Sequence, residues 1–192
     1  MPNSNEQVEV LNNPPSNGWE PVAGPETTDL LKYFKKEKHL DDEGCAILQG
    51  EARNILSKCT SPHAPAHPVT GIAIGYVQSG KTMSYTTLAA LARDNGYRML
   101  IIITGISVPL LGQGSSRLRD DLRLPSRADH KWQPFENPTT TDRKTLENTL
   151  ADWDDAVISG SEPQAVLITV MKNASHLKNL VDLLKSLDLK KV

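Results

Sequence analysis

Hydrophobic residues along this chain follow two different patterns. Between Thr27 and Ser57 they recur at helical intervals, with a break around residues 35–38 and Gly44, which predicts helices. After residue 68, short apolar runs alternate with amphipathic segments. Short apolar runs rich in β-branched residues are typical of strands, so strands and helices are expected to alternate there. The pattern therefore predicts an α/β fold with a parallel sheet.

Three apolar runs are expected to form the strands. They cover residues 69–76, 98–104 and 165–169. The middle run contains Met-Leu-Ile-Ile-Ile without a polar residue, which is typical of a strand buried on both faces. Residues 125–141 contain no such run and are expected to form a loop.

Four amphipathic segments are expected to form helices in this half of the chain. They are residues 82–95, a segment beginning at Pro109, residues 142–157, and a last segment opened by Asn173. Gly96 is a suitable residue to end the first of them. The third and fourth helices are expected to bury Leu146, Leu150, Trp153 and Val157, and Leu177, Leu180, Val181, Leu184 and Leu187, respectively.

Composition divides the chain into four expected regions. Residues 1–26 hold five prolines and no Lys or Arg, which favours a flexible arm. Residues 27–60 form a helical segment, and residues 61–69 form a Pro-rich linker, because three prolines there remove backbone donors. Residues 70–192 carry the alternating strands and helices.

Charge and composition narrow the functional classes. The 192 residues include 21 Lys and Arg and 23 Asp and Glu, a net charge of −2 that argues against a strongly basic nucleic-acid binder. The first eleven residues have no signal-peptide pattern, and no apolar run approaches the ~20 residues of a membrane span. Two cysteines cannot form a disulfide framework. We therefore expect a cytoplasmic protein with no membrane partner.

One motif carries specific chemistry. Residues 75–82 read Gly-Tyr-Val-Gln-Ser-Gly-Lys-Thr and match the phosphate-loop pattern G-x-x-x-x-G-K-[ST]. The glycines allow a close backbone approach, and the loop amides and following helix N-terminus attract phosphate. Lys81 would act on the β- and γ-phosphates, and Thr82 would ligate Mg²⁺. The predicted nucleotide site consists of Gly75, Gln78, Ser79, Gly80, Lys81 and Thr82.

This loop and residues 88–105 resemble the superfamily 2 helicase-like ATPases, with the greatest likeness to endonucleases that accompany bacterial restriction and phage-defence genes. The resemblance covers residue 70 to the end and is strongest over 71–122. It implies that residues 70–192 form the first half of a RecA-like P-loop NTPase domain. It also implies ATP and Mg²⁺ as ligands and DNA as a partner.

A second element looks like the family's motif Ia, which touches the nucleic-acid backbone in relatives. It runs from Val108 to Leu118, and it makes Gln113, Ser115 and Arg117 candidates for contact with DNA. An ordinary capped helix with solvated polar residues explains the element equally well. The basic residues between Arg117 and Lys131 leave the same choice, between phosphate contacts and a solvated face.

The acidic pair that such a motor needs is missing. Asp154 and Asp155 lie inside an expected amphipathic helix, so they do not qualify as the Walker B pair. In relatives, the Walker B strand would begin where this chain stops. We therefore expect the chain to be the N-terminal part of a longer protein, or a truncated copy.

The favoured function is ATP binding within an ATP-dependent DNA-processing enzyme, a helicase, translocase or endonuclease of restriction or phage-defence type. Two alternatives remain: a complete small P-loop kinase, and a non-catalytic nucleotide-binding module. A zinc site at Cys45, Cys59, His63 and His67 is disfavoured, because no C-x-x-C pair is present.

Overall fold

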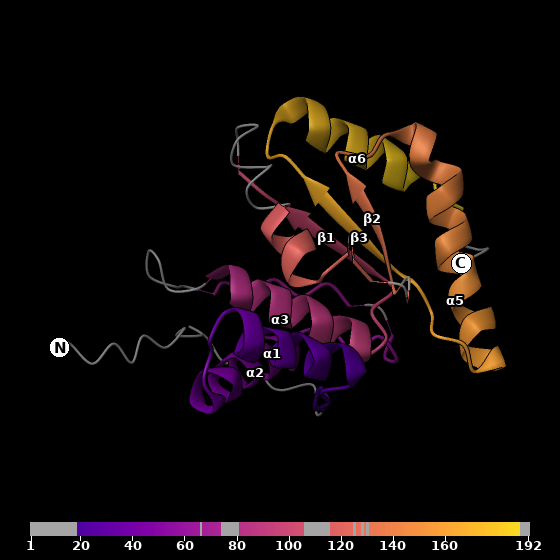
Figure 1. Ribbon diagram of the computed structural model, residues 1–192. Coiled ribbons are helices and arrows are strands. Elements are labelled where there is room, and N and C mark those ends of the chain that lie inside the picture. Colours follow the sequence, from indigo (N-terminus) through magenta and orange to yellow (C-terminus); the bar gives the residue numbers. More distant parts are fainter. Residues whose placement is uncertain are drawn as a thin grey trace. The chain divides into compact units, whose positions relative to one another are not determined.

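The computed structural model describes residues 19–65, 67–73, 81–105, 116–124, 126–127, 129 and 131–188. The chain divides into two compact units, residues 1–96 and residues 97–192 (Figure 1).

The described part of the first unit is built from helices. They are α1 (Pro25–Glu37), α2 (Asp42–Leu56) and α3 (Lys81–Asp94). Leu30 and Phe34 of α1 pack with Leu48 of α2 and Ala90 of α3 in one apolar cluster. The predicted helices are confirmed, but Gly44 lies inside α2 rather than at a break between helices. Its N–H donates to the Asp41 carboxylate at the start of α2.

Residues 19–26, assigned by composition to a flexible arm, and the following Thr27 are bonded to the end of α3. The Asp94 carboxylate accepts from the backbone N–H groups of Gly24, Glu26 and Thr27 and from the Thr27 hydroxyl, at 2.7–3.0 Å. The Asn95 amide exchanges two hydrogen bonds with the backbone of Val22. Helix α1 thus begins inside the expected arm, because a distant side chain satisfies its first N–H groups.

The second unit contains a parallel sheet of three strands, which confirms the α/β class. Strands β1 (Met99–Ile103), β2 (Trp132–Glu136) and β3 (Ala165–Val170) lie in the order β1-β3-β2. Helices α5 (Arg143–Ser159) and α6 (Ala174–Ser186) and the short η1 (Thr140–Asp142) complete its named elements. Residues 116–121 are also helical, within the segment expected after Pro109.

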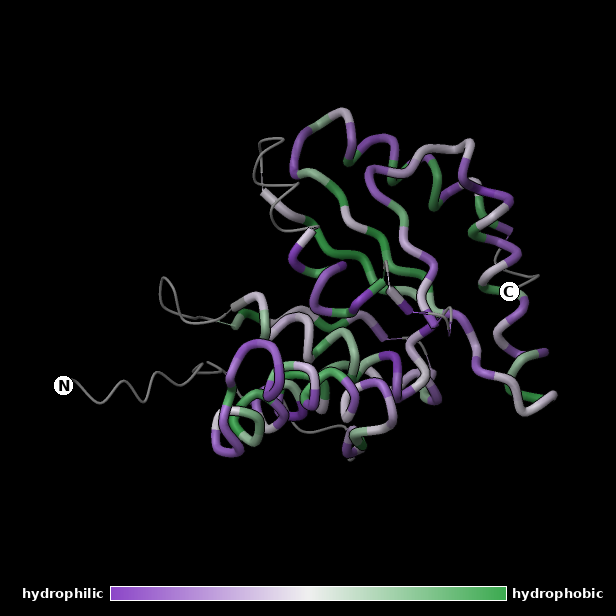
Figure 2. Tube along the Cα trace, viewed as in Figure 1, coloured by the Kyte–Doolittle hydropathy of each residue, from purple (hydrophilic) through white to green (hydrophobic). Residues whose placement is uncertain are grey.

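The central strand β3 organises the core of this unit. All six of its residues are buried, and the most apolar stretches of the chain trace follow β1 and β3 (Figure 2). The core cluster consists of Phe135, Leu146, Leu150, Val166, Ile168, Val170, Leu180 and Leu183. The predicted burial of two residues is wrong, since Val157 and Val181 are 57% and 45% exposed. Leu183 is buried instead, on the face of α6 that meets the core.

Strand β2 contradicts the loop expected at residues 125–141. Its sequence, Trp-Gln-Pro-Phe-Glu, contains a proline that argues against a strand. The strand lies at the sheet edge, and Asn137 donates its N–H to Thr169 of β3. Because N–H groups alternate in direction along a strand, Pro134 faces away from β3, where no donor is needed.

Two expectations for the other strands are also wrong. Ile101 and Ile103 of β1 are 38% and 53% exposed. They lie two residues apart and therefore share one face of the sheet, and that face of β1 is not fully covered. Residues 69–73 form no strand, and Val69 and Ile72 are exposed. A strand needs a neighbour to pair with, and the described elements of the first unit are all helices. Residues 74–76 lie outside the described residues.

Candidate nucleotide site and its surroundings

The predicted nucleotide site falls at the start of α3. This helix begins at Lys81, directly after the phosphate-loop glycine at position 80. Gly75, Gln78, Ser79 and Gly80 lie outside the described residues. Thr82 lies in the first turn and is partly buried, and its carbonyl accepts the Thr86 hydroxyl at 2.7 Å.

The first turn of α3 suits an anionic ligand. The first N–H groups of a helix have no partner within it, and the helix dipole makes this end partly positive. The first turn contains no acidic residue that would cancel this charge. The Thr82 hydroxyl offers the kind of hard oxygen ligand that Mg²⁺ prefers. The residues present therefore fit a phosphate group with its magnesium ion.

Helix α2 contacts this turn through a polar pair. The Ser84 hydroxyl donates to Glu51 Oε2 at 3.4 Å, and Met83 packs against the apolar cluster of the first unit. The sequence analysis missed Glu51. Its signal is its position between Leu48 and Ala52, two buried residues of α2, which places an acid beside the packed face of that helix.

Polar groups of the second unit gather at the carboxyl ends of its parallel strands. The Asn137 side chain accepts the N–H of Met171 at 2.9 Å, and Lys172 donates its N–H to Gly105 at 3.1 Å. Glu136, the last residue of β2, is exposed at this edge. Sequence analysis could not assign Glu136 to a strand end, because it did not predict β2.

Of the three residues expected to contact DNA, the structure describes one, Arg117. Arg117 is exposed in the helical residues 116–121, as is Arg119. Gln113 and Ser115 lie outside the described residues. Two basic residues further along the chain, Arg127 and Lys131, have side chains only 9% and 10% exposed, so they do not present a free basic face.

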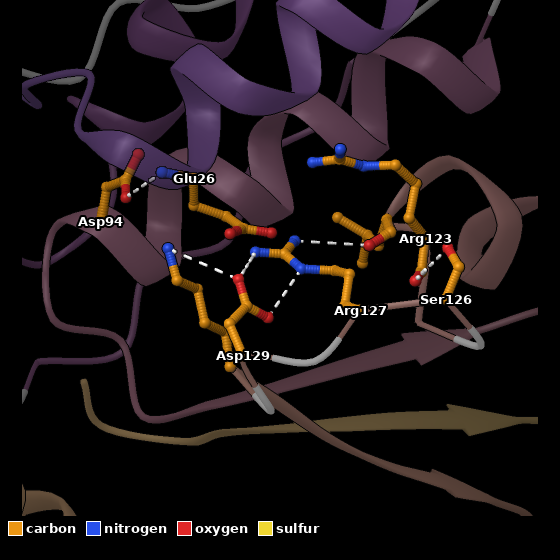
Figure 3. A network of polar contacts seen from close by, with 8 residues as sticks. Glu26, Asp94, Arg123, Ser126, Arg127 and Asp129 are labelled. Atoms are coloured by element: carbon orange, nitrogen blue, oxygen red, sulfur yellow. Dashed lines mark hydrogen bonds and ion pairs between the residues drawn. The ribbon is translucent and has the colours of Figure 1, made fainter.

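Asp129 is the acidic partner of those two residues. Arg127 donates to both of its carboxylate oxygens, at 2.9 and 2.7 Å, and Lys131 lies 3.8 Å away (Figure 3). The hydrogen bonds from Arg127 hold the pKa of the Asp129 carboxyl below its ordinary value, against the opposing effect of burial. The same view shows Asp94 accepting the N–H of Glu26 in the first unit.

Asp154 forms an ion pair with Arg98. Both terminal nitrogens of Arg98 donate to its carboxylate, at 3.0 and 2.5 Å, on the surface of α5.

Across the described ranges, no group of three His, Cys, Asp or Glu side chains could hold a metal ion. Burial raises the pKa of both thiols, Cys45 and Cys59.

No helix among the residues that the structure describes is long and apolar enough to cross a membrane. Comparison of the chain with protein-family models, curated proteins and solved structures found no match.

Proposed function

We propose that this chain binds ATP with Mg²⁺ through residues 75–82 and is the ATP-binding part of a DNA-processing enzyme. One observation carries the proposal: a complete phosphate-loop string ends where α3 begins, with Lys81 and Thr82 as its first two residues. A Gly-rich loop followed by a helix N-terminus is a favourable arrangement for binding phosphate.

Each residue of the loop has a distinct role in this proposal. The amides around Gln78 and Ser79 would bind phosphate oxygens, and Gly75 and Gly80 would allow the backbone to approach them. The Lys81 ammonium would offset the charge of the β- and γ-phosphates, and the Thr82 hydroxyl would hold Mg²⁺. The magnesium ion, when bound, supplies further charge neutralisation at the phosphates.

A RecA-like fold is part of the proposal. The parallel sheet and the alternation of strands and helices in the second unit support it, since P-loop domains are built from such units. The DNA partner rests on the motif Ia likeness, together with the exposed positions of Arg117 and Arg119. Such side chains are suited to phosphate contacts, which position a protein without reading base sequence.

A non-catalytic nucleotide-binding module is the second candidate. Phosphoryl transfer requires a carboxylate near the metal and the attacking water. The buried central strand β3 is followed by Met171, Lys172 and Asn173, none of which is acidic. This observation favours nucleotide binding without rapid turnover by this chain.

Product analysis separates the candidates. The full chain is incubated with Mg²⁺ and ATP, with and without double-stranded DNA, and ADP and phosphate are quantified. An ATPase motor releases phosphate faster when DNA is present, whereas a binding module leaves ATP intact. Transfer of phosphate to a small acceptor, without stimulation by DNA, would instead indicate the small kinase. Lys81→Ala must abolish any turnover, while Lys32→Ala, an exposed lysine on α1, must not.

A further inference from the structure

The first unit contains an open cavity of about 520 Å³, a volume within the usual range for small-molecule sites. Residues 19–21, which precede α1, form one wall. The other wall is formed by Gly50, Arg53 and Asn54 of α2 and by Ser57 directly after it. Because these four residues are spaced at three, four and seven positions from the first, they lie on one face of the helix.

Gly50 leaves this space open. It lies in the interior of α2, where glycine is among the least favourable residues. A Cβ at this position would meet no neighbouring atom within 4 Å, so the glycine does not serve a close approach of another segment. What the missing side chain provides is room in the cavity.

Two hydrogen bonds hold the walls of the cavity together. The Trp19 indole Nε1 donates to the backbone oxygen of Cys59 at 2.9 Å. Arg53 Nε donates to the backbone oxygen of Pro21 at 3.0 Å. The indole ring and the guanidinium group are therefore fixed in place before a ligand arrives, which lowers the entropic cost of binding.

Two opposite charges line the cavity without contacting each other. Arg53 uses only Nε, and within the described ranges its two terminal nitrogens bond to no protein group. The exposed Glu20 carboxylate likewise has no partner among the residues that the structure describes. A guanidinium group recognises a carboxylate, and a carboxylate accepts from an ammonium group. The Trp19 indole adds a flat apolar surface on which an aromatic ring can pack.

We propose that this cavity binds a free aromatic α-amino acid. The carboxylate of the ligand pairs with Arg53, its ammonium group pairs with Glu20, and its ring packs against the Trp19 indole. A ligand with a negative charge alone would be repelled by Glu20, and a ligand with a positive charge alone would be repelled by Arg53, so the site favours a zwitterion. This binding does not depend on the proposed nucleotide site.

The test is an NMR titration of the ¹⁵N-labelled full chain with L-phenylalanine. Two matched probes each lack one charge: 3-phenylpropionate has no ammonium group, and phenethylamine has no carboxylate. We expect L-phenylalanine to cause saturable shifts of the Trp19 indole N–H and the Gly50 amide signals. Each of the other two probes should bind about threefold more weakly or worse.

Variants then locate the site. Gly50→Leu adds a side chain to the open space without removing a hydrogen bond, and it should weaken L-phenylalanine binding about tenfold or more. Ala46→Leu is the matched control, since it adds a similar side chain at an exposed position of α2 outside the cavity lining and should leave binding unchanged. Glu20→Gln should weaken binding of L-phenylalanine about threefold but should not weaken binding of 3-phenylpropionate.

The amide spectrum of each variant, unchanged away from the substituted residue, verifies its fold. Three results would overturn the proposal: no saturable shift with L-phenylalanine, equal affinity for all three probes, or undiminished binding by Gly50→Leu.

Discussion

Two helices, α1 in the first unit and α6 in the second, begin in different ways. In the first unit, α1 begins without a side-chain cap of its own, and Asp94, about 70 residues further along, accepts its N–H groups. In the second unit, α6 is capped by the adjacent Asn173, and the strands bond to each other through a regular parallel ladder.

This difference shows where each unit is vulnerable. The second unit depends on apolar packing around β3, so its largest losses should follow removal of buried side chains. In the described part of the first unit, the Asp94 carboxylate joins the end of α3 to the residues at the start of α1. A polar substitution at that point should therefore cost nearly as much as a core truncation in the second unit.

The largest effect is expected from Leu183→Ala. The Leu183 side chain is fully buried in the core of the second unit, and its truncation leaves a cavity. We expect a loss of about 3 kcal/mol in the free energy of unfolding, measured by hydrogen exchange of the β3 and α6 amides. Val181→Ala, on the exposed face of the same helix, should change this value by less than about 0.5 kcal/mol. Equal losses from both substitutions would contradict the assigned core face.

Asp94→Ala should have the next largest effect. It removes an acceptor of three N–H groups and one hydroxyl, which leaves the start of α1 without partners. We expect the α1 amides to lose about 2–3 kcal/mol of protection against hydrogen exchange. Asp152→Ala, an exposed carboxylate on α5, serves as the control and should have little effect. Unchanged protection of α1 in Asp94→Ala would remove the contrast between the units.

Local caps should have a smaller effect, and a similar one in both units. Asp41 accepts from Gly44 at the start of α2, and Asn173 accepts from His176 at the start of α6. Replacing either residue by alanine should cost about 1 kcal/mol, as measured by urea unfolding. If Asp41→Ala cost as much as Asp94→Ala, the distant cap would have no special importance.

The smallest effect concerns Asp129 and pH. Because its pKa is lowered by Arg127, the ion pair stabilises the fold above the ordinary carboxyl pKa of 3.8, and this contribution is lost as the pH falls through the lowered value. At neutral pH, Asp129→Asn should therefore unfold at a lower urea concentration than the wild type. The expected loss in the free energy of unfolding is about 0.5–1 kcal/mol. The two midpoints should converge in strong acid. A constant difference between the two urea midpoints at all pH values would show that the charge of Asp129 does not cause the difference in stability.

Much of the fold could be predicted because its signals are local. The apolar run of β3, the cap at Asn173 and the end of α3 before Gly96 follow from residues adjacent in sequence. Gly96 adopts a positive φ of 91°, as its place after the helix requires.

The errors arose where the structure depends on residues far apart in the chain. The proline in β2 is tolerated only because that strand lies at the edge, and edge position follows from strand order rather than from local sequence. The exposure of Ile101 and Ile103 depends on which elements cover that face of β1, and local sequence does not specify this either. For the site, the phosphate-loop string predicted the position of α3, but the neighbouring Glu51 required the packing of α2 against that helix.

Equilibrium binding of a fluorescent ATP analogue to the full chain in Mg²⁺ tests the central claim most directly. We expect saturable binding that unlabelled ATP displaces, an affinity at least tenfold weaker in Lys81→Ala, and no change in Lys32→Ala. Such a result would establish residues 75–82 as a phosphate-binding loop. Binding of equal strength in the wild type and Lys81→Ala, or no binding by either, would contradict the account.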